Sequence, residues 1–340
     1  MKNSFPIENL DKRIKILLLH SYPGLLEELA KVGTEYNDFK SWTPLKLVSL
    51  SYFVGPYLRI TGKSLKEKYG PTALFYLDLF AGSGVNRVIQ DERKYYLAGS
   101  PIVVIDCATK CDCKFDKIFF VEKDEKYAAS LKKRLEYLEN YEYKDPSKLF
   151  PEAIFSWISG RYEVICEDSN KAIDLIVDKI ESERYKNFLA FIDPFKWELK
   201  MKTLEKLLEI EYGDIFITFQ ATLTAKEIGK ENLTTDKKKE ISDFLGLSEE
   251  EWRKLGSEEA VKNYYIGRIK EFRQTVEEIT IRSGKGYKYY LIFATRQKDP
   301  RWINIIKNLK NFIESFSGDI VEQSLKWLYG DMVRLTDFID

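Results

Sequence analysis

The sequence predicts an α/β fold built on a mostly parallel sheet with helices on both faces. Between about residues 73 and 219, short apolar runs alternate with longer amphipathic segments, which is the pattern of strand–helix–strand units. Four predicted strands end at acidic residues, namely Asp78, Glu122, Asp168 and Asp193. Two later β-rich runs, 278–282 and 287–295, flank a glycine-containing turn and predict an antiparallel hairpin.

Composition supports a substantial core but does not indicate a partner. Of the 340 residues, 44 % are hydrophobic and 14 % aromatic, while basic and acidic residues are equal at 54 each. Global charge therefore gives no indication of a polyanionic ligand. Locally, residues 282–310 hold eight basic side chains and a single acid, Asp299. A solvated face beside the sheet is favoured there over a nucleic-acid surface.

Several classes of protein and site are disfavoured. No apolar run approaches the ~20 residues of a membrane helix, and residues 14–19 are too short for a signal core, so we expect a cytoplasmic protein without membrane contact. The spacing of Cys107, Cys111 and Cys113 is not a zinc pattern, and buried free thiols are favoured. A single histidine, His20, argues against a histidine-based catalytic or metal site, and nothing in the sequence requires a metal.

The first 65 residues are predicted to form a helical segment. Apolar residues between 10 and 20 have helical spacing, and Pro23-Gly24 interrupts this first helix. A second helix is expected from Thr43-Pro44, with Thr43 as cap, to about residue 60.

The α/β pattern then follows in order. The first strand is 73–78, and a polar stretch, 85–98, separates it from a helix that is expected to start at Gly99-Ser100-Pro101 with Ser100 as N-cap. Further strands are expected at 117–122, 162–166, 188–192 and 214–219. The helices between and around them are expected at about 124–141, 170–183, 204–210 and 300–316. These elements define an α/β domain of residues 66–222 and 274–316. It is interrupted by a charged helical insertion or cap, 223–273, and followed by a tail, 317–340, of undetermined structure.

The end of the first strand is the most specific feature. Asp78 is followed by a glycine loop at Gly82 and Gly84, which lets backbone approach a ligand that a Cβ would block. Asp-x-Phe-Ala-Gly-x-Gly looks like the first motif of S-adenosylmethionine (SAM)-dependent methyltransferases. An ordinary tight turn after a core strand is the alternative. Because the carboxyl ends of parallel strands share one edge, the four strand-end acids should converge on one crevice.

SAM would need a matching set of groups in that crevice. Glu122 is placed to accept from the ribose hydroxyls, Asp168 (or Glu167) from the adenine amino group, and Asp78 from the ammonium of the methionine tail. The backbone of Phe80, Ala81, Gly82 and Gly84 would pass under the tail, and the helix that starts at Ser100 could face its carboxylate. Solvated strand-end carboxylates are the alternative for each acid.

Asp193-Pro194-Phe195 is the candidate for acceptor chemistry. In amino-methylating enzymes an Asp or Asn followed by Pro-Pro-aromatic accepts hydrogen bonds from the target amine while the ring stacks on the base. Positioning of this kind is most of the catalysis. Only one proline is present here, so Phe195 could instead be a core residue, and Trp197 is interpreted as packed.

Taken together, these motifs resemble the three-Cys-motif partner (TcmP) family of methyltransferase-like proteins. The resemblance is carried, in family order, by residues 42–47 (Trp-Thr-Pro-Leu-Lys-Leu), 76–84, Gly99-Ser100-Pro101, 119–124, 191–195 and 289–295. It implies a class I methyltransferase fold, with parallel strands closed by the antiparallel hairpin, and a SAM site. It also implies a radical-SAM-like partner that carries the three cysteines, but it supplies no acceptor. Lys196 departs from the family, which commonly has glycine after Asp-Pro-Phe.

Three functions follow as hypotheses. The leading one is a SAM-dependent methyltransferase acting on a nucleic acid or a partner protein. The second is a non-catalytic partner subunit that retains the fold. The third is a nucleic-acid-binding protein that uses the basic face of residues 282–310.

Overall fold

A seven-stranded sheet organises the molecule, which is described by a computed structural model over residues 6–40, 43–90, 92–283 and 286–332. The strand order is β6 (Tyr162–Ile165), β5 (Lys117–Val121), β2 (Ala73–Asp78), β7 (Lys186–Ile192), β8 (Asp214–Phe219), β10 (Lys288–Thr295) and β9 (Thr275–Arg282). All neighbours from β6 to β8 are parallel, whereas β10 is antiparallel to both β8 and β9. This is the Rossmann-like sheet of parallel strands with a C-terminal antiparallel hairpin that the sequence predicts.

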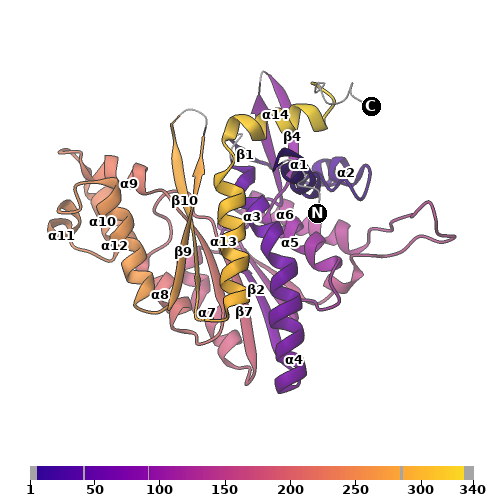
Figure 1. Cartoon of the computed structure of the whole chain (residues 1–340), viewed down its shortest axis with the longest axis horizontal. Helices are drawn as coiled ribbons and strands as arrows, with labels where there is room; N and C mark the ends of the chain where they lie inside the picture. Colours follow the sequence, from indigo (N-terminus) through magenta and orange to yellow (C-terminus); the bar gives the residue numbers. More distant parts are fainter. Residues whose placement is uncertain (1–5, 41–42, 91, 284–285, 333–340) are drawn as a thin grey trace.

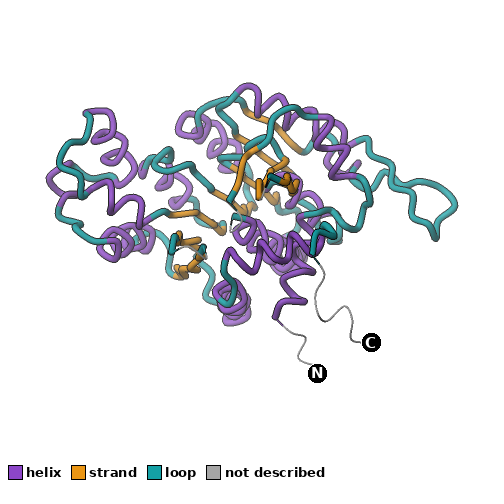
Figure 2. The backbone as a smooth tube through the Cα atoms, turned by 90° about the horizontal axis from the view of Figure 1, so that it is seen from above, coloured by secondary structure: helices purple, strands orange, loops and turns teal. Residues whose placement is uncertain are grey.

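Helices cover both faces of this sheet (Figure 2). One face packs against α3 (Pro44–Tyr57), α5 (Ser100–Thr109), α6 (Glu125–Glu139) and α13 (Pro300–Glu314), and the other against α7 (Ser169–Glu181) and α8 (Met201–Glu209). A hydrophobic core lies on each face of the sheet, and alternate strand residues pack into the two cores. Tyr76 packs into the core on the first face, and Phe75 and Leu77 pack into the core on the second. Every central strand is therefore apolar on both sides, as expected for a covered parallel sheet.

The N-terminal region is helical, with more elements than predicted. The helix expected at 10–20 is α1 (Pro6–Leu17), and α2 (Leu25–Val32) follows it. Beyond Pro56 the chain continues as a π-helical segment, Leu58–Lys63, and α4 (Ser64–Tyr69). The tail contains α14 (Gly318–Leu328). Trp42, Gly284, Lys285 and residues 333–340 lie outside the described residues.

The stretch 85–98, described from the sequence only as polar, is a hairpin. Strands β3 (Val85–Gln90) and β4 (Arg93–Ala98) pair antiparallel, and β1 (Asn37–Phe39) adds to β3 in parallel. Asn86, Val88 and Gln90 are buried at every second position of β3, and Tyr95 and Leu97 are buried at alternate positions of β4. This period of two builds a half-buried strand pair in spite of the charged residues between them. This small second sheet lies above the main one in Figure 1.

The segment 221–270 is helical and flanks the β8–β10 side of the sheet (Figure 1). It comprises α9 (Ala221–Ile228), α10 (Thr235–Leu245), α11 (Glu249–Arg253) and α12 (Glu258–Lys270). Phe219, Phe244 and Tyr265 stack on one another, with centroids 4.3 Å apart for Phe219 and Tyr265. These rings join the helices to the core that also holds α7 and α8. Within the part of the chain that is described, no helix is long and apolar enough to cross a membrane.

Candidate functional site

The strand register brings the predicted acids to one edge. Asp78 at the end of β2 is level with Phe120 on β5 and with Phe191 on β7. Glu122 and Asp193 each follow two residues later and so extend past the same edge. The chain also reverses its direction of strand addition between β2 and β7, and ligands of open α/β sheets bind outside such a switch point.

A cavity of about 810 Å³ opens at this edge. Nine of the predicted site residues line it: Phe80, Ala81, Gly82, Ser100, Glu122, Asp168, Asp193, Pro194 and Phe195. The other two, Asp78 and Gly84, do not line it; Asp78 is fully buried, and Gly84 packs against Leu131 and Gly99. The structure thus brings six of the eight predicted cofactor residues and all three predicted acceptor residues to one cavity.

The glycine loop is fixed by a residue from a distant part of the chain. Gly82 and Gly84 have φ of +62° and +84°, where glycine is favoured. The Asn37 side-chain oxygen accepts from the Ser83 N–H at 2.9 Å and from its hydroxyl at 3.1 Å. A Cβ on Gly82 would lie 2.5 Å from that oxygen. Strand β1 therefore braces the loop, a role that its three residues do not reveal in the sequence.

A buried arginine, Arg134, also stabilises the glycine loop. Arg134 of α6 donates to the carbonyls of Ser83 at 2.6 Å, Leu29 at 2.8 Å and Gly33 at 3.1 Å. Burial lowers the pKa of Arg134 to about 10, so it remains charged at neutral pH. These bonds tie the N-terminal helices, α6 and the glycine loop into one unit.

Glu122 bridges the glycine loop and the start of α6. Its Oε2 accepts from the Gly82 N–H and its Oε1 from the Asp124 N–H, both at 2.9 Å. Burial raises its pKa, while these two backbone hydrogen bonds act in the opposite direction. A carboxylate has about four acceptor sites, so Glu122 retains capacity for two further donors.

Asp78 is a buried carboxylate with an unpaired oxygen. Its Oδ1 accepts from the Phe80 N–H at 3.3 Å, and Oδ2 has no hydrogen-bond partner among the described residues. Burial raises the pKa of Asp78 to about 7; the Ser100 hydroxyl and the Phe80 N–H oppose that rise, and the charges of Asp193 and Glu122 add to it. Such an orphaned buried oxygen is suited to a cationic ligand group.

Ser100 differs from its predicted role as N-cap. Gly99 occupies that position, and Ser100 is the first helical residue, with its hydroxyl directed to Asp78. The extended Gly99 backbone allows its N–H to donate to the Gly84 carbonyl at 2.7 Å. A Cβ on Gly99 would meet the Gly84 carbonyl carbon at 2.9 Å, which explains the glycine.

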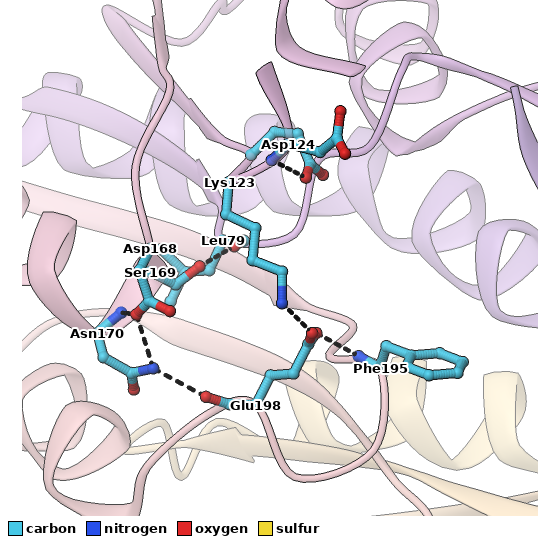
Figure 3. Close-up of polar contacts among 9 residues, drawn as sticks. Leu79, Lys123, Asp124, Asp168, Ser169, Asn170, Phe195 and Glu198 are labelled. Carbon is cyan, nitrogen blue, oxygen red and sulfur yellow. Dashed lines mark hydrogen bonds and ion pairs between the residues drawn. The ribbon is translucent and has the colours of Figure 1, made fainter. Parts of the chain in front are cut away.

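Asp168 belongs to a polar network in the cavity wall (Figure 3). It caps α7 by accepting from the Asn170 N–H at 2.8 Å, and the Asn170 amide donates to the Glu198 carbonyl at 2.8 Å. The Glu198 carboxylate accepts from the Phe195 N–H at 3.1 Å and pairs with Lys123. This network links the third and fourth strand ends, so the wall near Asp168 is held in place before any ligand binds.

Lys46 was missed by sequence reasoning as a site residue. It extends from α3 and forms an ion pair with Asp193, with only 10 % and 15 % of the two side chains exposed. Its ammonium also lies 4.6 Å from the centroid of the Phe39 ring. The signal was present as a lysine in the otherwise uncharged helix 44–57. A buried charge in such a helix needs a partner, and Asp193 is that partner.

Two hydroxyl groups line the cavity beside Asp193 without a partner. The side-chain oxygens of Thr218 and Tyr289 are buried and unpaired among the described residues, and both residues line the cavity. Burial raises the pKa of Tyr289 well above its usual value, and the Asp193 charge adds to this effect. Polar groups of this kind are normally satisfied, so they mark a place for a polar ligand.

Phe195 is an exposed residue at the cavity and not part of the core, since 69 % of its surface is accessible. The next residue, Lys196, has φ +61°, the left-handed region that favours glycine. Trp197 is packed, as expected, and donates to the Thr224 hydroxyl at 3.0 Å. The turn after Asp193 therefore presents one aromatic ring and buries the other.

Two further candidate sites in the sequence are the basic run 282–310 and the cysteines. Arg296 donates to the Leu208 carbonyl, Lys310 to the Glu278 carbonyl, and Lys288 pairs with Glu258, so part of the basic run 282–310 is engaged within the molecule. Cys107 is buried, and the described residues include no group of three or more His, Cys, Asp or Glu side chains that could hold a metal ion.

Comparisons with known proteins find only low similarity. No family model matches the chain, and no curated protein matches it in sequence. Among solved structures, protein LPL1258 from Legionella pneumophila is 12 % identical with a TM-score of 0.45, covering 82 % of this chain and 94 % of that one. An O-methyltransferase from Bacillus cereus in complex with SAH is 14 % identical, with a TM-score of 0.43 and coverages of 85 % and 99 %. Human methyltransferase-like protein 13 in complex with SAH is also 14 % identical, with a TM-score of 0.35 and coverages of 86 % and 98 %.

Proposed function

We propose that this chain is a SAM-dependent methyltransferase. The observation that carries the proposal is the convergence of Gly82, Glu122 and Asp193 on one cavity at the switch point of the sheet. An adenosyl cofactor bound there would have its ribose near one strand end and its reactive methyl near the next.

The available groups fit the parts of SAM. The free lone pairs of Glu122 would accept from the ribose diol, and Asp168 would accept from the adenine amino group. Asp78, which is buried and does not line the cavity, would act on the ammonium through a water, and the N-terminus of α5 at Ser100 would face the carboxylate. When bound, SAM supplies an electrophilic methyl group. This chain's own residues bind the cofactor and orient the acceptor at Asp193, Pro194 and Phe195.

The sequence resemblance to the TcmP family is part of the proposal. Its glycine after Asp-Pro-Phe corresponds here to Lys196, whose positive φ is a conformation that glycine adopts without strain. We propose on the same basis a cytoplasmic protein with a radical-SAM-like partner. Pull-down of this chain from extract, with mass spectrometry of the captured proteins, tests the partner.

A non-catalytic role is the second candidate, and one observation favours it. The Lys46 ammonium forms an ion pair with the Asp193 carboxylate, which is the group that an acceptor amine would need. If that pair never opens or is never shared, the chain would bind SAM without transferring a methyl group.

Calorimetry with SAM tests the proposed function. We expect wild type to bind, and Glu122→Ala to bind about 100-fold more weakly, because hydrogen bonds to a charged group contribute about 1.5–3 kcal/mol each. Glu125→Gln is the matched control, since Glu125 is an exposed carboxylate at the start of α6, near the same edge, that does not line the cavity. Absence of SAM binding to wild type would refute the proposal.

A further inference from the structure

We propose that the methyl acceptor is the exocyclic amine of an adenine or cytosine base, presented by a single-stranded nucleic acid. This inference rests on the proposed function and names its substrate. It is carried by the unpaired polar groups beside Asp193 and by two exposed aromatic rings with lysines at the cavity mouth.

The polar groups around Asp193 match one pattern of base edge. Asp193 accepts hydrogen bonds, whereas the adjacent Tyr289 hydroxyl and the Lys46 ammonium can donate them. An amine beside a ring nitrogen, as in adenine and cytosine, offers a donor to Asp193 and a lone pair to Tyr289 or Lys46. Uracil has no exocyclic amine, and its corresponding edge places a carbonyl oxygen where Asp193 needs a donor.

Because Lys46 is a donor beside Asp193, this part of the cavity favours a base over a simple alkyl amine. A protein lysine brings only donors, and it would have to displace the Lys46 ammonium from Asp193 without offering Lys46 or Tyr289 anything to bond. A base can share Asp193 with Lys46 because its ring nitrogen accepts a hydrogen bond. The hydroxyls of Thr218 and Thr222 extend the same polar wall toward α9.

The mouth of the cavity carries stacking surfaces. Phe195 and Tyr287 both line it and are 69 % and 61 % exposed, unusual values for large aromatic side chains. Each ring has a lysine nearby: Lys196 lies 5.1 Å from the Phe195 centroid and Lys226 lies 5.5 Å from the Tyr287 centroid. Aromatic faces beside cations are the combination that binds unstacked bases and the adjoining phosphates.

Charge divides the cavity in a way that fits the two ligands. Asp124 and Asp168 line the cavity with Glu122, and the neighbouring Lys123 is paired with Glu198, so this wall suits a cationic cofactor. Lys226, which lines the cavity, and Lys196, which lies over the Phe195 ring, form no ion pair with any residue that the structure describes, so their charges are available to phosphates. The single-strand requirement follows because a paired base has its exocyclic amine engaged in the duplex.

The transfer balances without a further reactant. The lone pair of the amine nitrogen forms the new N–CH₃ bond as the S–CH₃ bond of the sulfonium breaks, which leaves a neutral thioether. One N–H proton then departs to solvent past the Asp193 carboxylate. Asp193 acts by directing the amine lone pair toward the methyl group.

Binding to labelled 15-nucleotide single strands and their duplexes tests the inference. In anisotropy titrations we expect single strands to bind more tightly than duplexes and binding to weaken as salt rises. Phe195→Ala and Tyr287→Ala should each weaken single-strand binding about tenfold through lost stacking. Phe150→Ala is the matched control, because Phe150 is 72 % exposed but does not line the cavity.

A methyl-transfer assay on homopolymers identifies the base. Tritium from labelled SAM should enter poly(A) or poly(C) and not poly(U), and Tyr289→Phe should lower kcat with little effect on single-strand affinity. SAM binding without any single-strand binding, or transfer only to protein, would overturn this inference and leave the proposed function standing. Absence of SAM binding would instead refute the proposed function itself.

Discussion

The two halves of the cavity are built differently. In the half around Glu122, carboxylates from strand ends already accept hydrogen bonds from neighbouring backbone N–H groups, as Glu122 does from Gly82 and Asp168 from Asn170. In the half around Asp193, an ion pair with Lys46 lies beside the hydroxyls of Thr218 and Tyr289, which have no partner among the described residues. The first half is organised by the fold itself, whereas the second awaits a polar ligand. Cofactor binding and acceptor binding should therefore fail separately.

The largest separable effect is expected at Asp193. Asp193→Ala should lower kcat for methyl transfer to single strands by on the order of 10²–10³, because the acceptor amine loses its orienting partner. The Kd for SAM should stay nearly unchanged, as Asp193 is assigned to the acceptor half. Steady-state kinetics and calorimetry on the same preparation measure both. Equal loss of SAM affinity and kcat would show that the two halves are not independent.

The pH dependence of SAM binding examines the cofactor half. Asp78 has a pKa of about 7 in the folded protein, so below that pH its carboxyl is protonated and must lose the proton to receive an ammonium. By linkage, the Kd for SAM should be about 20-fold weaker at pH 5.5 than at pH 7.5. Asp78→Asn should bind weakly and lose this dependence. A flat profile in wild type would place the ammonium elsewhere.

The Asp78 carboxyl also makes the free energy of unfolding depend on pH, in the opposite direction to SAM binding. Its folded-state pKa lies above the unfolded value of about 4, so its ionisation opposes folding, and its contribution to stability falls between about pH 4 and 7. Burial raises the pKa of Asp214 to about 7 as well, so thermal unfolding alone does not isolate Asp78. Subtracting the pH dependence of stability of Asp78→Asn from that of wild type gives the contribution of Asp78.

The Lys46–Asp193 pair can be measured by a double-mutant cycle. Lys46→Met and Asp193→Asn, singly and together, should give a coupling of about 2 kcal/mol in urea unfolding, because each single change leaves a nearly buried charge without its partner. Additive single effects would show that the pair does not hold the acceptor half together.

The smallest effect is expected at Lys196. Replacing a non-glycine residue at positive φ by glycine relieves about 1 kcal/mol of strain, partly offset by the flexibility of the unfolded chain. Lys196→Gly should therefore stabilise the protein by about 0.5 kcal/mol, whereas Lys196→Ala should not, since alanine keeps the strain. Chemical denaturation of both variants distinguishes them, and stabilisation by alanine would contradict the role of φ.

The convergence of the strand-end carboxylates was largely predictable from the sequence, because strand ends of a parallel sheet share an edge and Asp78, Glu122 and Asp193 each end an apolar run. The other groups around Asp193 were not predictable, since Lys46 and Tyr289 reach it from a helix and a late strand that are close only after folding. The β3–β4 hairpin was missed because charged residues between Val85 and Leu97 masked its alternation. Strand β1, only three residues long, left no pattern to find.

A crystal structure with S-adenosylhomocysteine tests the central claim most directly. We expect the ribose hydroxyls within hydrogen-bond distance of Glu122, the amino-acid tail beside Gly82 and Asp78, and the sulfur facing Asp193. The product bound outside this cavity, or bound within it with its sulfur directed away from Asp193, would contradict the account.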